Sequence, residues 1–192
     1  MTAHGTPDHQ PLRIVTVVGS PRAGSRTRLA AESLANALAT TLAESGTPAE
    51  TAPTIDLAEL ASGLLVPWSL SAEAAEAVAT VQSSTILLLA TPTFKGSITG
   101  ILKLLLDTIP SGGLEGVVAI PVAIAGAPAH RHLAEIALRP ILAELGAATP
   151  VPSFLLLEEE LGDVQSAADD YATAHAPVAA AVAQALAVRR KE

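Results

Sequence analysis

The sequence contains no cysteine, and this absence excludes several kinds of structure and chemistry. Disulfide bonds, thiolate nucleophiles and cysteine metal sites are ruled out, and a reducing, cytoplasmic compartment is the expected location. Long apolar runs are missing too: 49% of the residues are hydrophobic, yet no uncharged stretch is long enough to cross a bilayer. We therefore expect no membrane partner, and we expect the surplus apolar surface to lie in a subunit interface.

Basic residues are few, because 11 Lys and Arg stand against 19 Asp and Glu, for a net charge of −8. This balance argues against a nucleic-acid partner, since neutralising phosphates needs a basic surface. The 192 residues fit one domain, expected at 12–190, after a polar tail at 1–11 that we expect to be disordered. The tail lacks the charged-then-apolar pattern of a targeting signal.

Short apolar runs alternate with helical patterns along the chain. Clear strands are predicted at 13–18, 85–90, 116–125 and 152–157, and a weaker edge strand at 50–57. Helices are predicted at 25–45, 72–82, 98–109, 129–145 and 166–190. The alternation predicts an α/β fold of the flavodoxin-like type: a three-layer sandwich with helices on both faces of a five-stranded parallel sheet of order 2-1-3-4-5.

This strand order locates a ligand site. In open parallel sheets, ligands bind at the carboxyl ends of the strands, where the strand order reverses. Here the reversal lies between the first and third strands, which lead into the segments 19–28 and 91–97. We therefore expect these two loops to meet.

The first loop is rich in hydroxyls, glycine and arginine. It reads Gly-Ser-Pro-Arg-Ala-Gly-Ser-Arg-Thr-Arg over 19–28 and holds three of the eleven basic residues. Hydroxyls, free N–H groups and a helix N-terminus together bind phosphate, and Arg22 can add a charge-assisted contact. The alternative is a solvated turn with Ser25 or Thr27 as the helix N-cap. The loop matches neither the Rossmann nor the P-loop pattern, which disfavours both classes.

The second loop, 91–97, holds one of only four aromatic residues in the chain. Phe94 at the end of a strand is costly unless it covers something, and Pro92 stiffens the backbone beside it. Lys95 and Gly96 allow an anionic or electron-rich ring to approach closely. The pattern predicts a flat heteroaromatic ligand against this loop; the alternative is that Phe94 caps the core.

Three motifs in the same order resemble the NADPH-dependent FMN reductase family, and within it the reductases of alkanesulfonate monooxygenase systems. They are Gly-Ser-Pro-Arg-x-x-Ser-Arg-Thr from residue 19, Ala-Thr-Pro-Thr-Phe-Lys-Gly-Ser from residue 90, and Ala-His-Arg-His-Leu-Ala-Glu-Ile from residue 129. The resemblance runs from about residue 13 to residue 157.

By position, the resemblance implies an FMN site made of three loops. The phosphate loop contributes Ser20, Arg22, Ser25, Arg26 and Thr27, the loop along the flavin ring contributes Pro92, Thr93, Phe94, Lys95 and Gly96, and the third loop contributes Ala125, Gly126 and Ala127. Family members commonly carry Tyr where Phe94 stands, so the resemblance implies stacking without a hydroxyl contact.

The resemblance implies hydride transfer from NADPH to FMN, with no catalytic side chain and no metal, because the flavin supplies the chemistry. In the sulfonate-linked branch, reduced FMN leaves to supply a separate flavin-dependent monooxygenase. Arg22 or Arg26 is a candidate partner for the 2′-phosphate of NADPH. Two alternatives stay open: an enzyme that retains FMN and reduces quinones, azo dyes or metal ions, and a non-catalytic flavodoxin-like electron carrier.

The predicted helix at 129–145 contains Pro140, whose ring clashes with the carbonyl of Ile136, so a kink or π-bulge is expected there. In the sulfonate-linked reductases this helix has a π-helical segment at a tetramer interface, with an aromatic or His residue where Ile136 stands. We expect a homo-oligomer, a dimer or tetramer, through helices 98–109 and 129–145. Because Ile136 is aliphatic, it cannot make the aromatic contacts of that interface.

Three further features have structural interpretations. His130 and His132 are two residues apart, so they do not share a helical face and no metal pair is expected. Lys103 and Asp107 are four apart and are expected to pair on a helix. The acidic run 158–160 is expected to be solvated after the last strand.

Overall fold

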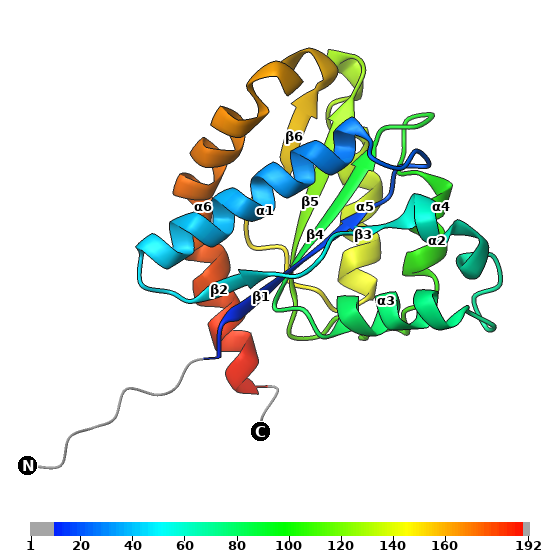
Figure 1. Ribbon diagram of the computed structural model, residues 1–192, viewed down its shortest axis with the longest axis horizontal. Helices are drawn as coiled ribbons and strands as arrows, with labels where there is room; N and C mark the ends of the chain where they lie inside the picture. The colour runs from blue at the N-terminus through cyan, green and yellow to red at the C-terminus, as the bar shows by residue number, and fades with distance from the viewer. Residues whose placement is uncertain (1–9, 190–192) are drawn as a thin grey trace, which may run out of the picture.

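A parallel sheet runs through the centre of the computed structural model, which describes residues 10–189 (Figure 1). Its strands are β1 (Leu12–Val18), β2 (Ala49–Thr51), β3 (Ile55–Asp56), β4 (Ile86–Pro92), β5 (Val118–Ala125) and β6 (Phe154–Leu157). The order across the sheet is β2-β1-β4-β5-β6, with β3 also paired to β1. When β2 and β3 are counted as one position, the predicted order 2-1-3-4-5 is confirmed.

The edge strand is split at Pro53. β2 pairs with the start of β1, at Leu12–Ile14, and β3 pairs with its end, at Val17 and Val18. Because proline has no N–H to donate, the pairing stops there and resumes two residues later. The edge position is as predicted, but the continuous strand over 50–57 is wrong.

Helices cover both faces of the sheet. One face carries α1 (Arg26–Glu44) and α6 (Val164–Arg189); the other carries α2 (Leu57–Leu64), α3 (Ala72–Gln82), α4 (Gly100–Leu106) and α5 (Leu133–Glu144). Strand side chains alternate between the two cores: Ile14 and Val18 face α1 and α6, whereas Val15 and Val17 face the other helices. A sheet covered on both faces needs strands that are apolar on both sides.

Helix α2 is absent from the sequence-based prediction. It has only eight residues and starts where β3 ends, with Asp56 as its N-cap. Helix α4 is shorter than the predicted 98–109, because Thr99 is its N-cap and its last turn ends at Asp107. Both differences matter for the site, since Asp56 and Thr99 contact the first loop.

The predicted helix at 129–145 is divided into a 3-10 turn, η1 (Pro128–His130), and α5. Pro140 lies inside α5 as predicted. Of the kink or π-bulge expected there, the π-bulge is wrong, because α5 is α-helical throughout. Ile136 and Pro140 are both exposed. Water can therefore hydrate the Ile136 carbonyl that Pro140 leaves without a donor, and the helix need not widen.

Helix α6 follows a 3-10 segment, η2 (Glu158–Asp163), and continues through Pro177 without interruption. Contrary to the sequence-based expectation, the segment Glu158–Val188 is long and apolar enough to cross a membrane by length and composition alone. One face of α6, which includes Ala172 and Ala176, is buried against α1 and the sheet. It is therefore a core helix of this fold.

Of the tail predicted at 1–11, the structure describes only residues 10 and 11, which are exposed and precede β1. The rest of that prediction, and the last residue of the predicted domain 12–190, fall outside the described residues.

Candidate functional site

The two predicted loops meet at the carboxyl ends of β1 and β4, which pair side by side up to Val18 and Ala90. Beyond that pair, the N–H of Gly19 donates to the carbonyl of Ala90 at 2.7 Å. The Thr99 hydroxyl donates to the carbonyl of Gly19. Ala90 directly precedes segment 91–97 and Thr99 follows it by two residues, so the start of segment 19–28 lies against both ends of the second segment, as predicted.

Gly19 is required by close packing against α4. A Cβ on this residue would stand 2.6 Å from Cβ of Leu102 and 3.2 Å from the carbonyl of Ala90. The Thr99 hydroxyl both contacts Gly19 and caps α4, accepting from the N–H of Leu102 at 3.3 Å. Thr99 is a site residue that the sequence analysis missed; its position before an apolar helix start is an N-cap signal.

Hydroxyls of the first loop stabilise the loop itself. Ser25 is the N-cap of α1 and accepts from the N–H of Arg28 at 3.3 Å. Ser20 is buried, and its hydroxyl contacts the N–H and carbonyl of Arg22, each at 3.2 Å. Thr27 is buried inside the first turn of α1. The alternative that Ser25 is an N-cap is thus confirmed, and its hydroxyl proton remains available to a ligand at the helix N-terminus.

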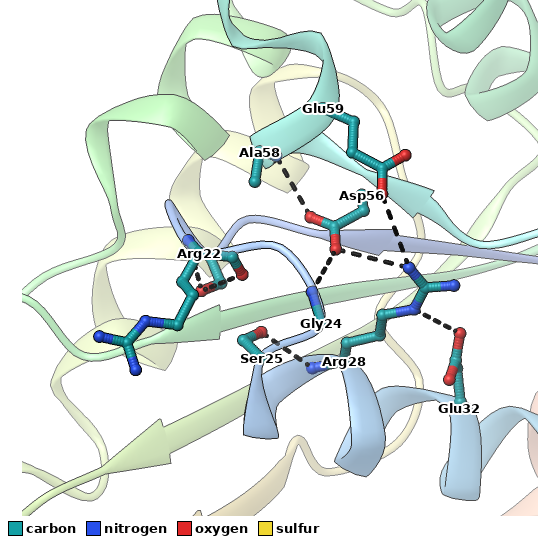
Figure 2. A network of polar contacts seen from close by, with 9 residues as sticks. Arg22, Gly24, Ser25, Arg28, Glu32, Asp56, Ala58 and Glu59 are labelled. Carbon is teal, nitrogen blue, oxygen red and sulfur yellow. Dashed lines mark hydrogen bonds and ion pairs between the residues drawn. The ribbon is translucent and has the colours of Figure 1, made fainter.

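A buried carboxylate, Asp56, holds the first loop from the β3 side (Figure 2). Its two oxygens accept from the N–H groups of Gly24 and Ala58, both at 3.2 Å. The guanidinium of Arg28 lies 3.6 Å from the same carboxylate. Asp56 therefore joins the loop, α1 and α2. Asp56 was not predicted as a site residue, although an Asp before helically spaced leucines is an N-cap signal.

Cations of the first loop differ in how far they are neutralised. Arg28 contacts Glu32 at 2.8 Å besides Asp56, and the hydrogen bond to Glu32 raises the pKa of Arg28. Arg26 forms an ion pair with Glu158 at 3.0 Å. Arg22 is exposed, and within residues 10–189 its guanidinium has no ionic partner; Figure 2 shows it pointing away from the Asp56 network. Arg22 is thus the cation of this loop that is available to an anion.

The second loop is a tight turn that leaves its tip in solvent. The N–H of Thr93 donates to the carbonyl of Ile124 at 2.7 Å, which ties the loop to β5. Phe94 and Ser97 exchange two backbone hydrogen bonds of 2.9 and 3.0 Å. Lys95 has a positive φ of 51° at the tip, and Phe94 is 50% exposed. The alternative that Phe94 caps the core is therefore wrong.

Thr93 provides a test of whether a flavin fits here. Its hydroxyl oxygen is buried and has no hydrogen-bond partner, and no other side-chain polar atom in the described part of the chain shares this state. An unsatisfied buried hydroxyl costs free energy that a polar ligand can recover. With the unpaired Arg22 and the exposed Phe94 nearby in the same pair of loops, these groups suit the phosphate and polar ring of FMN.

The third loop follows β5 and adds open backbone. Ala125 is buried, whereas Gly126 is exposed and Ala127 is half-buried. The nearest group to a Cβ placed on Gly126 is the carboxyl of Glu158, at 4.0 Å. A ligand can therefore approach the backbone of this loop.

The acidic run 158–160 is not simply solvated. Glu158 pairs with Arg26, and Glu160 pairs with Arg131 while accepting from the N–H of Leu157 at 2.6 Å. The hydrogen bond from Arg131 lowers the pKa of Glu160. Glu158 and Glu159 are exposed, as expected, but the ion pairs of Glu158 and Glu160 were not predicted, because they depend on the carboxyl end of β6 lying beside α1 and η1.

His130 and His132 are both exposed, and His132 contacts Glu135 at 3.3 Å. Within residues 10–189, no group of three or more His, Cys, Asp or Glu side chains could hold a metal ion. The predicted pair of Lys103 and Asp107 is confirmed on α4.

Comparisons with known proteins agree with this geometry. The profile of the NADPH-dependent FMN reductase family matches residues 12–161. An FMN reductase (NADPH) of Escherichia coli (strain K12) is 43% identical over 61 residues, so the match spans only 32% of this chain and 32% of that relative. An NADH-dependent FMN reductase of Pseudomonas putida is 30% identical over 132 residues, 69% of this chain and 70% of the relative.

A solved structure extends the likeness to three dimensions. The apo form of an NADH:FMN oxidoreductase is 32% identical, covers 85% of this chain and 89% of its own, and superposes with a TM-score of 0.69. The family match covers most of the chain and includes all three loops of the candidate site. The chain therefore belongs to the NADPH-dependent FMN reductase family.

Proposed function

We propose that this protein catalyses the NAD(P)H-dependent reduction of FMN at the carboxyl ends of β1, β4 and β5. The observation that carries the proposal is the buried, unpartnered hydroxyl of Thr93, in a loop beside the end of β1, where Thr99 contacts Gly19. A flavin supplies a phosphate, which can pair with Arg22, and a ring edge whose polar groups can hydrogen-bond to Thr93. Neither side chain has such a partner within the described part of the protein. Family membership supports the same reaction.

Each loop is assigned a binding role. Arg22, the Ser25 hydroxyl and the N-terminus of α1 hold the phosphate, since charge and helix dipole both favour an anion there. Phe94 stacks against the ring, and Thr93 hydrogen-bonds to its edge. Gly126 lets the third loop approach the ring. Bound FMN supplies the hydride acceptor, so the side chains bind and orient the reactants and exclude water from them.

NADPH is the proposed hydride donor. Arg22 is the candidate contact for its 2′-phosphate as well as for the FMN phosphate, because one guanidinium has enough N–H donors for two anions. Arg26, the other candidate, is already paired with Glu158. The two relatives named above differ in the nucleotide of their names, since one is an FMN reductase (NADPH) and the other an NADH-dependent FMN reductase. Comparison of kcat/KM for NADPH and NADH, in the native protein and in Arg22→Gln, tests the assignment: a preference for NADPH that Arg22→Gln leaves intact contradicts it.

Free FMN is proposed as a diffusible substrate that supplies a separate flavin-dependent monooxygenase in the cytoplasm. The test is steady-state NADPH oxidation by flavin-stripped protein as free FMN is varied. Saturation with FMN in large excess over enzyme, with free reduced FMN as the product, supports the proposal. Activity that needs only one FMN per chain plus a quinone indicates a flavin-retaining enzyme instead. Absence of oxidation under both conditions indicates a flavin carrier.

A homo-oligomer through α4 and α5 is also proposed. A cavity of about 460 Å³ lies between these helices, lined in part by Leu106, Ile109 and Ile141. Ile136 on α5 is a large apolar side chain that is 64% exposed, so its burial against a second copy would be favourable. In sedimentation experiments, Ile136→Glu is expected to yield smaller species, whereas Val188→Glu, a matched change at an exposed residue of α6, leaves the assembly unchanged. Equal behaviour of the two variants contradicts this interface.

A further inference from the structure

Glu158 follows β6 directly and lies between two loops of the candidate site. Its Oε2 is 3.0 Å from Nη2 of Arg26, the first residue of α1. Its carboxyl carbon is 4.0 Å from the position that a Cβ on Gly126 would occupy. One carboxylate therefore links the phosphate loop to the third loop, although its residue belongs to neither.

The position of Glu158 is set by its neighbours in η2. The N–H of Leu157 donates to Oε2 of Glu160 at 2.6 Å, and Arg131 donates to Oε1 of the same side chain. These contacts hold the first turn of η2 against β6 and η1. Glu159 lies next to Glu158 and is also exposed, but it has no ionic partner within the described residues.

An anion at the N-terminus of α1 meets this carboxylate. Arg26 begins the helix and can turn toward a phosphate there, but Glu158 already engages its guanidinium. Both side chains are half-exposed, 63% for Arg26 and 50% for Glu158, and ion pairs of this kind are weak. A phosphate can therefore displace the carboxylate, and the remaining like-charge repulsion opposes tight binding.

We infer that Glu158 competes with the FMN phosphate for Arg26 and thereby weakens flavin binding, so that FMN exchanges rather than stays bound. The inference rests on the proposed function and assigns its exchange step to one side chain. Arg22 holds the phosphate whether or not Glu158 is paired with Arg26, whereas Arg26 is shared between the phosphate and Glu158. The carboxylate thus acts on FMN through Arg26 and does not touch the reacting atoms.

The test measures the dissociation constants of FMN and of riboflavin, which lacks the phosphate, from the quenching of flavin fluorescence on flavin-stripped protein. Glu158→Gln is expected to bind FMN about threefold to tenfold more tightly, with riboflavin unchanged, because only the phosphate competes for Arg26. Glu159→Gln removes the same charge from the neighbouring residue and is expected to leave both constants unchanged. In an Arg26→Gln background, Glu158→Gln is expected to have no effect.

Three outcomes overturn the inference. Equal tightening by Glu158→Gln and Glu159→Gln indicates a general charge effect, and equal tightening of FMN and riboflavin indicates an effect on the ring. Weaker FMN binding in Glu158→Gln shows that Glu158 positions Arg26 for the phosphate instead. Thermal melts, and Glu158→Ala as a second variant, guard against a folding defect. If the native protein binds neither flavin, the proposed function itself fails; if it binds FMN and only the Glu158 variants disagree, only the inference fails.

Discussion

The two loops that form the candidate site are built in opposite ways. In the first, Gly24, Ser20 and Ser25 all have hydrogen-bond partners within the protein, and two of its three arginines have ionic partners. In the second, the Thr93 hydroxyl has no partner and Phe94 lies half in solvent. The first loop is therefore formed before any ligand arrives, while the second keeps groups that only a ligand can satisfy.

This difference follows from what each loop is attached to. The buried Asp56 lies beside the first loop and fixes Gly24, a residue with a positive φ of 61°. The second loop is tied to β5 by the backbone of Thr93, and its tip is closed by the two backbone hydrogen bonds between Phe94 and Ser97. A preformed phosphate site limits the entropy lost on binding, and an unsatisfied ring site adds contacts specific to the flavin. Substitutions at four positions test this difference between the two loops.

The largest effect is expected where the first loop is anchored. Asp56→Ala leaves the N–H groups of Gly24 and Ala58 without their acceptor and removes a partner of Arg28. We expect the free energy of unfolding to fall by about 2–4 kcal/mol in urea titrations. Asp107→Ala, which removes an exposed carboxylate from α4, is the control, with an expected change within about 0.5 kcal/mol. Similar values for both variants contradict a preformed loop.

The free cation of the first loop should contribute to binding without contributing to stability. Arg22→Gln removes the guanidinium that has no ionic partner, so a charge-assisted contact to phosphate worth about 1.5–3 kcal/mol is lost. FMN binding measured by calorimetry should weaken by about tenfold or more, while riboflavin binding and the melting temperature are unchanged. Arg13→Gln, at the other end of β1, serves as the control. An equal loss for riboflavin would show that Arg22 contacts the ring.

The exposed aromatic of the second loop should affect both flavins alike. Phe94→Ala removes the stacking surface and is expected to weaken FMN and riboflavin binding by about 1 kcal/mol each, or about fivefold. Because Phe94 is half in solvent, the free energy of unfolding should barely change. Trp68→Ala removes an aromatic side chain that is 89% exposed elsewhere. If the Trp68 variant binds flavin as weakly as the Phe94 variant, the stacking assignment is wrong.

The smallest effect is expected at Thr93, where the protein's stability and its FMN affinity should change in opposite directions. Thr93→Val replaces a buried hydroxyl without a partner by a methyl group of similar size. The flavin-free protein should keep its stability or gain up to about 1 kcal/mol, whereas FMN affinity should fall by about threefold. Differential scanning calorimetry with and without FMN separates the stability of the flavin-free protein from the affinity for FMN. A clear loss of stability without flavin means that the hydroxyl already has a partner.

Much of the fold could be predicted because its signals are local. Apolar runs such as 85–90 and 116–125, and the helical pattern of 25–45, predicted the alternation of strands and helices, and the flavodoxin-like order chosen for five strands brought the two loops together. Errors arose where a short element follows another without a break. Helix α2 begins at the residue after β3, and no turn residue separates them. The π-bulge in α5 was wrong because the exposed Pro140 leaves a carbonyl that water can hydrate.

Local sequence patterns specify the alternation of strands and helices, the two loops at the sheet edge and the residue types that suit an FMN phosphate and ring. Which of those residues are free depends on how the chain packs in three dimensions. Asp56 and Glu158 come from distant parts of the chain and neutralise Arg28 and Arg26, which leaves Arg22 available. The physical reason is that periodicity is encoded among near neighbours, whereas charge pairing depends on which strand ends converge in space.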